Sequence, residues 1–278
     1  MKVNYHTHTK RCGHASGEDR EYVESAIEAG LEVLGFADHC PFVYPDGYVS
    51  GIRLTPAEVD GYFSSLEGLK KEYEKDIRIY IGFEAEYLPA LIEKQKELLS
   101  GYPLDYMIQG QHFLGPDKEQ VYVGHPFKEE AYLAEYARLS IEGIESGDYL
   151  YLAHPDLPHF LGDDKTYRKY MLPVCEALKK ENKPAEINIL GLADQRHYPV
   201  DRFWILANEV GVMAILGVDA HSPAQLLNRE GIKQGEQWAE KYGIKLLEKM
   251  QELAQPMIKN QYGQYLLKLA AEFSGKEK

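Results

Sequence analysis

Residues 2–9 read Lys2-Val3-Asn4-Tyr5-His6-Thr7-His8-Thr9, a short strand-like segment that runs into two histidines separated by one residue. Side chains two residues apart on an extended strand point to the same face, so both imidazoles can reach one metal ion. A lone His-x-His pair is weak evidence for a metal site, because an accidental or structural pair explains it equally well. The interpretation depends on whether the rest of the chain repeats this arrangement.

Seven β-like segments of this kind alternate with longer helical patterns along the chain. They cover residues 2–5, 33–37, 77–83, 106–109, 149–153, 185–189 and 212–217. Such alternation is typical of βαβ units that build a parallel sheet. Because no internal repeat or Pro/Gly/Ser-rich linker interrupts it, we interpret residues 1–278 as one α/β domain with a C-terminal helical tail from about Gly243.

Three of the connecting segments carry specific signals. Residues 130–146 place apolar side chains three or four positions apart, which predicts a helix that covers a sheet face. Thr55-Pro56-Ala57-Glu58 predicts a helix start, with Thr55 as N-cap, and the pattern continues towards Lys75. Residues 40–54 form the longest predicted loop, and we expect a wall or lid of the site there.

Nine side chains able to bind a metal lie at or just past the ends of the β-like segments. They are His6, His8, His14, His39, Glu84, His112, His154, Asp219 and His221. A core histidine or surface carboxylate is the better interpretation for any one of them alone, but the set exceeds the three or four protein ligands of a mononuclear site. Since parallel barrels build their active sites at the carboxyl ends of the strands, the set predicts a multinuclear metal enzyme.

Composition narrows the class of partner. The net charge of −13 argues against sequence-independent nucleic-acid binding, which depends on Lys and Arg neutralising phosphates. A small anionic substrate stays compatible, since bound cations can reverse the local charge. Three cysteines without a disulfide pattern, no apolar leader and no apolar stretch of ~20 residues lead us to expect a cytoplasmic protein without a membrane partner.

In order and spacing, these residues resemble the motifs of the PHP (polymerase and histidinol phosphatase) superfamily. The matching segments are His6-Thr7-His8, His14, Asp38-His39, Glu84, Gln111-His112, Ala153-His154-Pro155 and Asp219-Ala220-His221. The resemblance covers residues 1 to about 225. Three segments resemble the monofunctional histidinol-phosphatase branch in particular: residues 6–14, residues 109–114 and Glu186-Ile187-Asn188.

The resemblance implies a distorted (β/α)7 TIM-like barrel with three divalent metal ions, whether zinc, iron or manganese. It implies that the first ion is held by His6, His8, Glu84 and Asp219, the second by Glu84, His112 and His154, and the third by His14, His39 and His221. The bridging ligand would then be Glu84. The expected catalytic residues are Glu84, Asp219 and His221.

The implied reaction is hydrolysis of L-histidinol phosphate to L-histidinol and phosphate in histidine biosynthesis, with a small-molecule phosphate ester as the partner. Forked hydrogen bonds from arginine suit a phosphate group. The candidate substrate-binding residues are Arg168, Arg196, His197 and Asn188, with Arg53 as a weaker candidate, and Asp156, Asp163 and Asp164 as possible partners of the amine. We expect His125 to be a loop residue, while His159 can be a surface group or a substrate contact.

Three alternatives stay open. An amidohydrolase-type barrel also begins with His-x-His, but it typically needs a carboxylated lysine after the fourth strand, where this chain has Gln109-Gly110-Gln111-His112. A PHP-type enzyme acting on another phosphomonoester or on nucleotides keeps the fold and changes the substrate. A metal-binding module without catalysis would be expected to have lost ligands, and here all nine positions are filled.

Overall fold

Parallel strands form the centre of the protein, whose computed structural model describes residues 1–119 and 121–247. One sheet has the order β1 (Val3–Asn4), β2 (Val33–His39), β3 (Arg78–Ala85) and β4 (Tyr106–Gln109). A second parallel pair consists of β5 (Ala185–Asn188) and β6 (Ala214–Gly217). The pairing register of β2 with β3 sets His39 directly opposite Glu84, so two predicted metal ligands meet at one end of the sheet.

The predicted strand at residues 149–153 is reduced to single bridges. Leu152 forms isolated parallel bridges with Gln109 of β4 and Ala185 of β5. The backbone N–H of Ala153 donates to Gln109 at 2.8 Å, and that of Glu186 donates to Leu152 at 2.9 Å. The segment therefore links the two sheets without a run of paired residues.

A further bridge connects the first and last segments of the sheet order. Thr7 pairs with Ala220, and the His8 N–H donates to the Ala220 carbonyl at 2.9 Å. The described chain is thus an α/β fold around a curled parallel sheet. The complete seven-stranded barrel stays a prediction.

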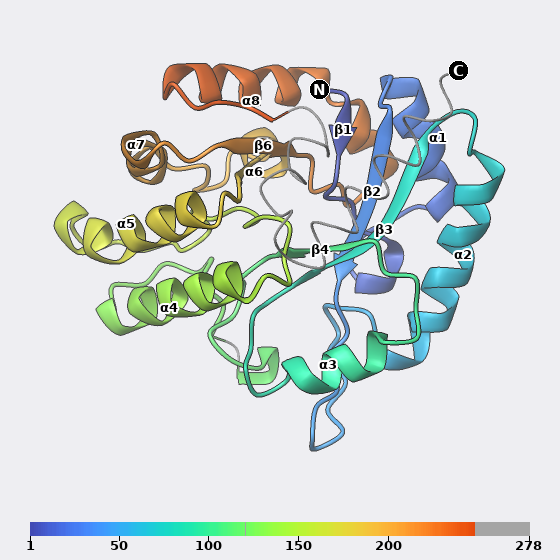
Figure 1. Ribbon diagram of the computed structural model, residues 1–278, viewed down its shortest axis with the longest axis horizontal. Coiled ribbons are helices and arrows are strands. Elements are labelled where there is room, and N and C mark those ends of the chain that lie inside the picture. The colour runs from blue at the N-terminus through green and yellow to red at the C-terminus, as the bar shows by residue number, and fades with distance from the viewer. Residues whose placement is uncertain (120, 248–278) are drawn as a thin grey trace.

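Helices cover the outside of the strands, with α4, α5, α7 and α8 grouped along one side and α1 and α2 along the other (Figure 1). Their bounds are α1 Asp19–Ala29, α2 Val59–Glu72, α3 Ile92–Leu99, α4 Glu130–Ser146, α5 Asp164–Lys180, α6 Ile189–Ala193, α7 Asp201–Val210 and α8 Arg229–Lys241. Short 3-10 turns occur at Lys10–Cys12, Pro56–Glu58, Asp117–Glu119 and Pro223–Leu227.

Helix α4 has the predicted bounds. Its apolar stripe buries Leu133, Ala137 and Ile144 in the largest core cluster, which includes residues of α5 and α7. Full burial of a side chain such as Leu133 contributes about 1.5–3 kcal/mol. The apolar stripe therefore predicts both the presence of the helix and the face that it buries.

The predicted helix after Thr55 begins one turn later than expected. Thr55 and Glu58 form a reciprocal capping box around a 3-10 turn, and α2 follows from Val59. Pro56 suits this first turn because the missing N–H has no partner there in any case. The helix ends at Glu72, before Lys75.

The predicted C-terminal helix does not begin at Gly243. Gly243 has φ 65°, and Leu246 forms a parallel bridge with Ala214 of β6, so residues 244–247 run beside that strand. The rest of the predicted tail, residues 248–278, lies outside the described residues. Within residues 1–119 and 121–247, every helix is too short or too polar to cross a bilayer.

Candidate metal centre

The predicted ligands converge at one cavity of about 670 Å³ at the carboxyl ends of the strands. Seven of them line it: His14, His39, Glu84, His112, His154, Asp219 and His221. His6 and His8 are fully buried and contact the same carboxylates. All nine predicted ligands are therefore part of one cluster.

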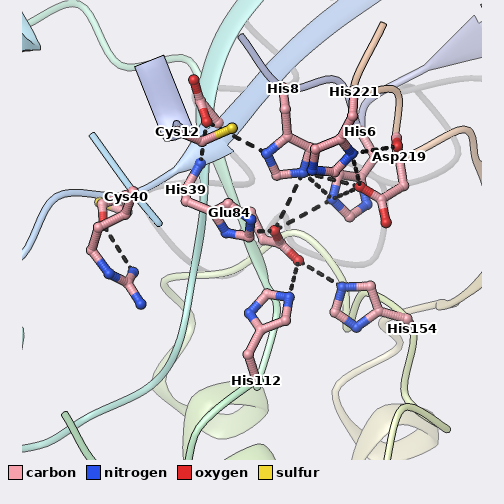
Figure 2. Close-up of polar contacts among 12 residues, drawn as sticks. His6, His8, Cys12, His39, Cys40, Glu84, His112, His154, Asp219 and His221 are labelled. Carbon is pink, nitrogen blue, oxygen red and sulfur yellow. Dashed lines mark hydrogen bonds and ion pairs between the residues drawn. The ribbon is translucent and has the colours of Figure 1, made fainter. Parts of the chain in front are cut away.

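Glu84 lies at the centre of this cluster, and its two oxygens face different histidines (Figure 2). Oε1 is 2.7 Å from His154 Nε2 and 3.3 Å from His112 Nε2. Oε2 is 3.1 Å from His39 Nδ1 and 3.5 Å from both His6 Nε2 and His8 Nε2. A carboxylate placed in this way has the geometry of a bridging ligand.

Several groups of three donor atoms lie within 4.8 Å of one another. They are His6, His8 and Asp219; His6, Glu84 and His154; His8, His39 and Glu84; His14, His39 and His221; and His8, Cys12 and His221. The first and fourth groups correspond to two of the three expected ligand sets. Cys12, which is fully buried, was not among the predicted ligands.

The nitrogen and oxygen atoms of the predicted ligands are better placed to bind cations than to bond to one another. His6 Nε2 and His8 Nε2 face each other at 3.2 Å, and the other ring nitrogen of His6 is held by Glu186. Glu84 Oε2 and Asp219 Oδ1 are buried without a hydrogen-bond partner. The nearest groups to these two oxygens are imidazole nitrogens, His39 Nδ1 at 3.1 Å and His8 Nε2 at 3.0 Å. Nitrogen and carboxylate donors that converge in this way suit divalent cations.

Titration in the cluster also favours cation binding. Burial would lower the pKa of the His6 imidazole, but Glu186, Asp219 and Glu84 outweigh it and raise that pKa well above its usual value. The pKa of His8 is raised in the same sense, because hydrogen bonds to Asp219 and Asp38 outweigh burial. A cation can replace these protons, since a ligating imidazole must be neutral.

In the third histidine group, the pKa of His221 is shifted in the opposite direction to those of His6 and His8. Burial, with the nearby His8 ring, lowers the pKa of His221 to about 4, so its imidazole is neutral at pH 7. Its Nδ1 is 3.0 Å from the Asp219 carbonyl, and His14 Nδ1 is 2.9 Å from the Cys12 carbonyl. In each ring the Nδ1–H is donated to backbone, which leaves Nε2 with a lone pair for a metal.

Three carboxylates that were not predicted to have this role lie behind the rings of predicted ligands. His6 Nδ1 lies 2.7 Å from Glu186, His112 Nδ1 lies 3.3 Å from Glu86, and His8 Nδ1 lies 3.5 Å from Asp38. Hydrogen-bonded partners of this kind, here Glu186 and Glu86, fix the tautomer and raise the basicity of a metal-binding imidazole. Strand periodicity was the available signal for Glu86, which is two residues beyond Glu84.

Two ligands have backbone conformations that are unfavourable for non-glycine residues. His154 has φ 28° and Asp219 has φ 55°. Conformations of this kind cost about 1–3 kcal/mol and persist where surrounding contacts hold them. Glu186 accepts the His154 N–H at 3.1 Å, and Asn188 donates to Asp219 at 3.1 Å.

The two arginines predicted to bind phosphate, Arg196 and Arg168, lie in different parts of the structure. Arg196 lines the cavity, is 40% exposed, and is paired with Asp194 at 3.0 Å and Tyr198 at 3.1 Å. Arg168 is not brought to the cavity: on α5 it faces outward and pairs with Glu209 at 2.5 Å. The physical reason is its helix register, since the neighbouring Tyr167 takes the buried face.

The other two predicted substrate contacts have structural partners. Asn188 is buried, caps α6 and bonds Asp219 and Glu186. His197 lies outside the cavity lining, where its Nε2 is 2.6 Å from the Leu157 carbonyl and its ring stacks on His159 at 4.1 Å. Neither side chain faces the cavity as an unpaired group.

The loop at residues 40–54 forms part of the cavity wall, as predicted. Its cavity-lining residues are Tyr48, Gly51, Ile52 and Arg53. His125 also lines the cavity, together with the aromatic side chains of Phe113, Tyr122 and Tyr198. Among the described lining residues there is no lysine, which counts against the amidohydrolase alternative.

None of the aspartates considered for the substrate amine lines the cavity. Asp156 is buried and accepts hydrogen bonds from Val200 N–H at 2.6 Å and Trp204 Nε1 at 2.9 Å. Asp163 caps α5, and the Asp164 side chain is 92% exposed. The acidic side chains in the lining, apart from the ligands, are Glu86, Asp117 and Asp194.

The chain is similar in sequence to a known protein family and to several proteins of known name. The sequence family described as the PHP domain matches residues 4–190. A probable histidinol-phosphatase of Deinococcus radiodurans is 27% identical over 235 residues, which cover 80% of this chain and 86% of the relative. A histidinol-phosphatase of Bacillus subtilis is 32% identical over 140 residues, covering 46% of this chain and 52% of the relative.

Comparison with solved structures agrees on the fold. The crystal structure of a histidinol phosphate phosphatase from Lactococcus lactis, complexed with zinc, L-histidinol and phosphate, superposes with a TM-score of 0.67. The match covers 88% of this chain and 95% of that one, at 21% identity. The curled parallel sheet is therefore shared over most of both chains.

Proposed function

This chain belongs to the PHP domain family, and we propose that it is a histidinol-phosphatase, a metal-dependent phosphoric monoester hydrolase. Its reaction is the hydrolysis of L-histidinol phosphate to L-histidinol and phosphate, a step of histidine biosynthesis. The observation that carries the proposal is the convergence of all nine predicted ligands around Glu84 at one cavity. The names of the relatives support the substrate.

Three divalent ions are proposed for the centre, in a complete seven-stranded barrel. Their ligand sets are His6, His8, Glu84 and Asp219; Glu84, His112 and His154; and His14, His39 and His221. Two converging groups, His6, His8 and Asp219 and His14, His39 and His221, support the first and third sets. The contacts of Glu84 Oε1 with His112 and His154 support the second. The zinc in the Lactococcus lactis structure makes zinc the first ion to test, although the mixed nitrogen and oxygen donors also suit iron and manganese.

Bound cations of this kind lower the pKa of a water ligand and stabilise charge that develops on phosphoryl oxygens. The protein residues orient and enclose the substrate. Arg196, at the cavity wall, can turn from Asp194 to hold the phosphate by forked hydrogen bonds. Aromatic walls from Phe113, Tyr122 and Tyr198 suit the imidazole of the substrate.

The proposal is tested by assaying the purified protein on a panel of phosphate esters. We expect histidinol phosphate to be hydrolysed with a higher kcat/KM than generic phosphomonoesters or nucleotides. Equal turnover of the whole panel would refute the substrate assignment and favour a general PHP phosphoesterase. Fewer than two metal ions per chain in the active preparation, measured by elemental analysis, would contradict the trinuclear centre.

A further inference from the structure

Arg53 lies in the cavity wall but is almost fully buried, with 3% of its surface exposed. Its guanidinium donates to both oxygens of Glu86 at 3.1 Å and to the Cys40 carbonyl at 3.1 Å. On its other side, Nε donates to Asp117 at 3.2 Å. With these partners Arg53 is engaged on both sides, and it is poorly placed to turn towards a phosphate.

The Glu86 side of this arrangement reaches a proposed metal ligand. Glu86 Oε1 accepts from Arg53 and lies 3.3 Å from His112 Nδ1. The opposite ring nitrogen, His112 Nε2, lies 3.3 Å from Glu84 Oε1. Arg53 therefore holds the carboxylate that sets the tautomer and orientation of the His112 ring.

The Asp117 side reaches the wall loop, residues 40–54. Asp117 accepts hydrogen bonds from the hydroxyls of Tyr44 and Ser50. The adjacent Lys118 pairs with Asp46 at 2.6 Å, and the Arg53 guanidinium packs over the Phe42 ring at 4.6 Å. The wall loop is thus held against Asp117 and its neighbour Lys118, and Arg53 links this contact region to Glu86.

We propose that Arg53 is a positioning residue that couples docking of the wall loop to binding of the metal held by Glu84, His112 and His154. The proposal rests on the metal centre of the proposed function. When the loop is docked, Arg53 sits between Asp117 and Glu86, and the His112 ring is held for its ion. Since such coupling is reciprocal, binding of that ion stabilises the docked loop.

The first experiment measures zinc affinity by competition with a chromophoric chelator. In Asp117→Asn and Tyr44→Phe, which change the loop side only, we expect one ion to bind about tenfold more weakly. This is the lower end of the effect seen when a group that orients a metal ligand is lost. Arg53→Lys should weaken the same ion further. The matched control is Arg202→Lys. Arg202 also donates hydrogen bonds to backbone carbonyls, those of Phe160 and Gly162, but these lie in a segment, residues 160–162, that holds none of the predicted ligands.

The second experiment measures hydrogen exchange of residues 41–52 in the wild-type protein with and without zinc. We expect zinc to slow exchange there, and His112→Ala to remove most of this protection while zinc still binds elsewhere. Unchanged zinc affinity in all three loop-side and Arg53 variants, or equal exchange with and without zinc, overturns the coupling. If wild-type protein binds no zinc and hydrolyses no histidinol phosphate, the proposed function itself fails first.

Discussion

Individual residues decide whether the carboxylates can occupy the centre of the site. A Cβ added at Gly110 would lie 1.9 Å from Glu84 Oε1, and one at Gly217 would lie 1.8 Å from Glu186 Oε1. Neither position tolerates a side chain without moving the carboxylate. The glycines are therefore required for close approach.

Gly110→Ala should reduce kcat by about 10–100-fold, the range seen when the support of a metal ligand is lost. The added methyl group would displace Glu84 from between the histidines. Gly68→Ala in α2 is the control, because a Cβ there meets nothing within 4 Å. We expect it to leave activity unchanged and to stabilise the protein by about 0.5–1 kcal/mol. Steady-state kinetics with urea unfolding measures both, and normal turnover of Gly110→Ala would contradict the role of the glycine.

Arg196 and Arg168 form a matched pair, since the sequence proposed both for phosphate and only one lies at the cavity. Arg196→Gln should lower kcat/KM by roughly 10–100-fold, because a charge-assisted hydrogen bond contributes about 1.5–3 kcal/mol. Arg168→Gln removes only an exposed ion pair, which water screens, so we expect activity and stability close to those of the wild-type protein. Equal losses of activity in the two variants would show that the cavity position of Arg196 does not matter.

At the level of elements, the periodic patterns predicted well where a helix or strand occurs. They predicted poorly which way an individual side chain points. The stripe of α4 predicted both bounds because four apolar residues share one face. Helix α5 starts at Asp164, and the outward direction of Arg168 depends on which stripe of that helix packs inward. Residues 149–153 are buried like a strand, yet only Leu152 pairs on both sides, because they bridge two sheets.

The junction of α5 and β5 carries a buried cation whose titration can be measured. Lys183 is 3% exposed and donates to the Ile144 carbonyl at 2.7 Å. Burial lowers its pKa to about 8. Since an unfolded lysine has a pKa near 10.4, the unfolded chain binds more protons between about pH 8 and 10.4, and the free energy of unfolding rises with pH there.

Lys183→Met keeps the buried stem and removes the ammonium group. Relative to this variant, wild-type protein should gain about 3 kcal/mol of stability as the pH rises from 8 to above 10, from a pKa shift of roughly two units at 1.36 kcal/mol each. Urea unfolding at several pH values checks this. Parallel stability curves for the two proteins would show that Lys183 titrates normally.

The whole molecule brings opposite charges together that the sequence keeps far apart. His6 and Glu186 are 180 positions apart and lie 2.7 Å from each other. Asp219 joins the same cluster from beyond β6. Assembly of the sheet therefore creates the site, and protons and metal ions compete for it.

Metal binding should release protons and weaken as the pH falls. The pKa values of His6 and His8 are raised well above 6.5. Protons therefore compete with zinc for these rings, and zinc affinity should rise as the pH increases towards the raised pKa values. Calorimetric titration in buffers of different ionisation enthalpy counts the released protons. Binding without proton release would contradict the raised pKa values.

The sequence by itself determined which side chains converge, because residues at the ends of parallel strands must meet at one edge of the sheet. The meeting of His6, Glu84 and Asp219 could be predicted without coordinates for that reason. Only the tertiary structure decided the partners behind them, such as Glu186 for His6, and the separate positions of Arg53, Arg168 and Arg196. Those contacts depend on side-chain direction and on distances between elements remote in the chain, which a local pattern does not encode.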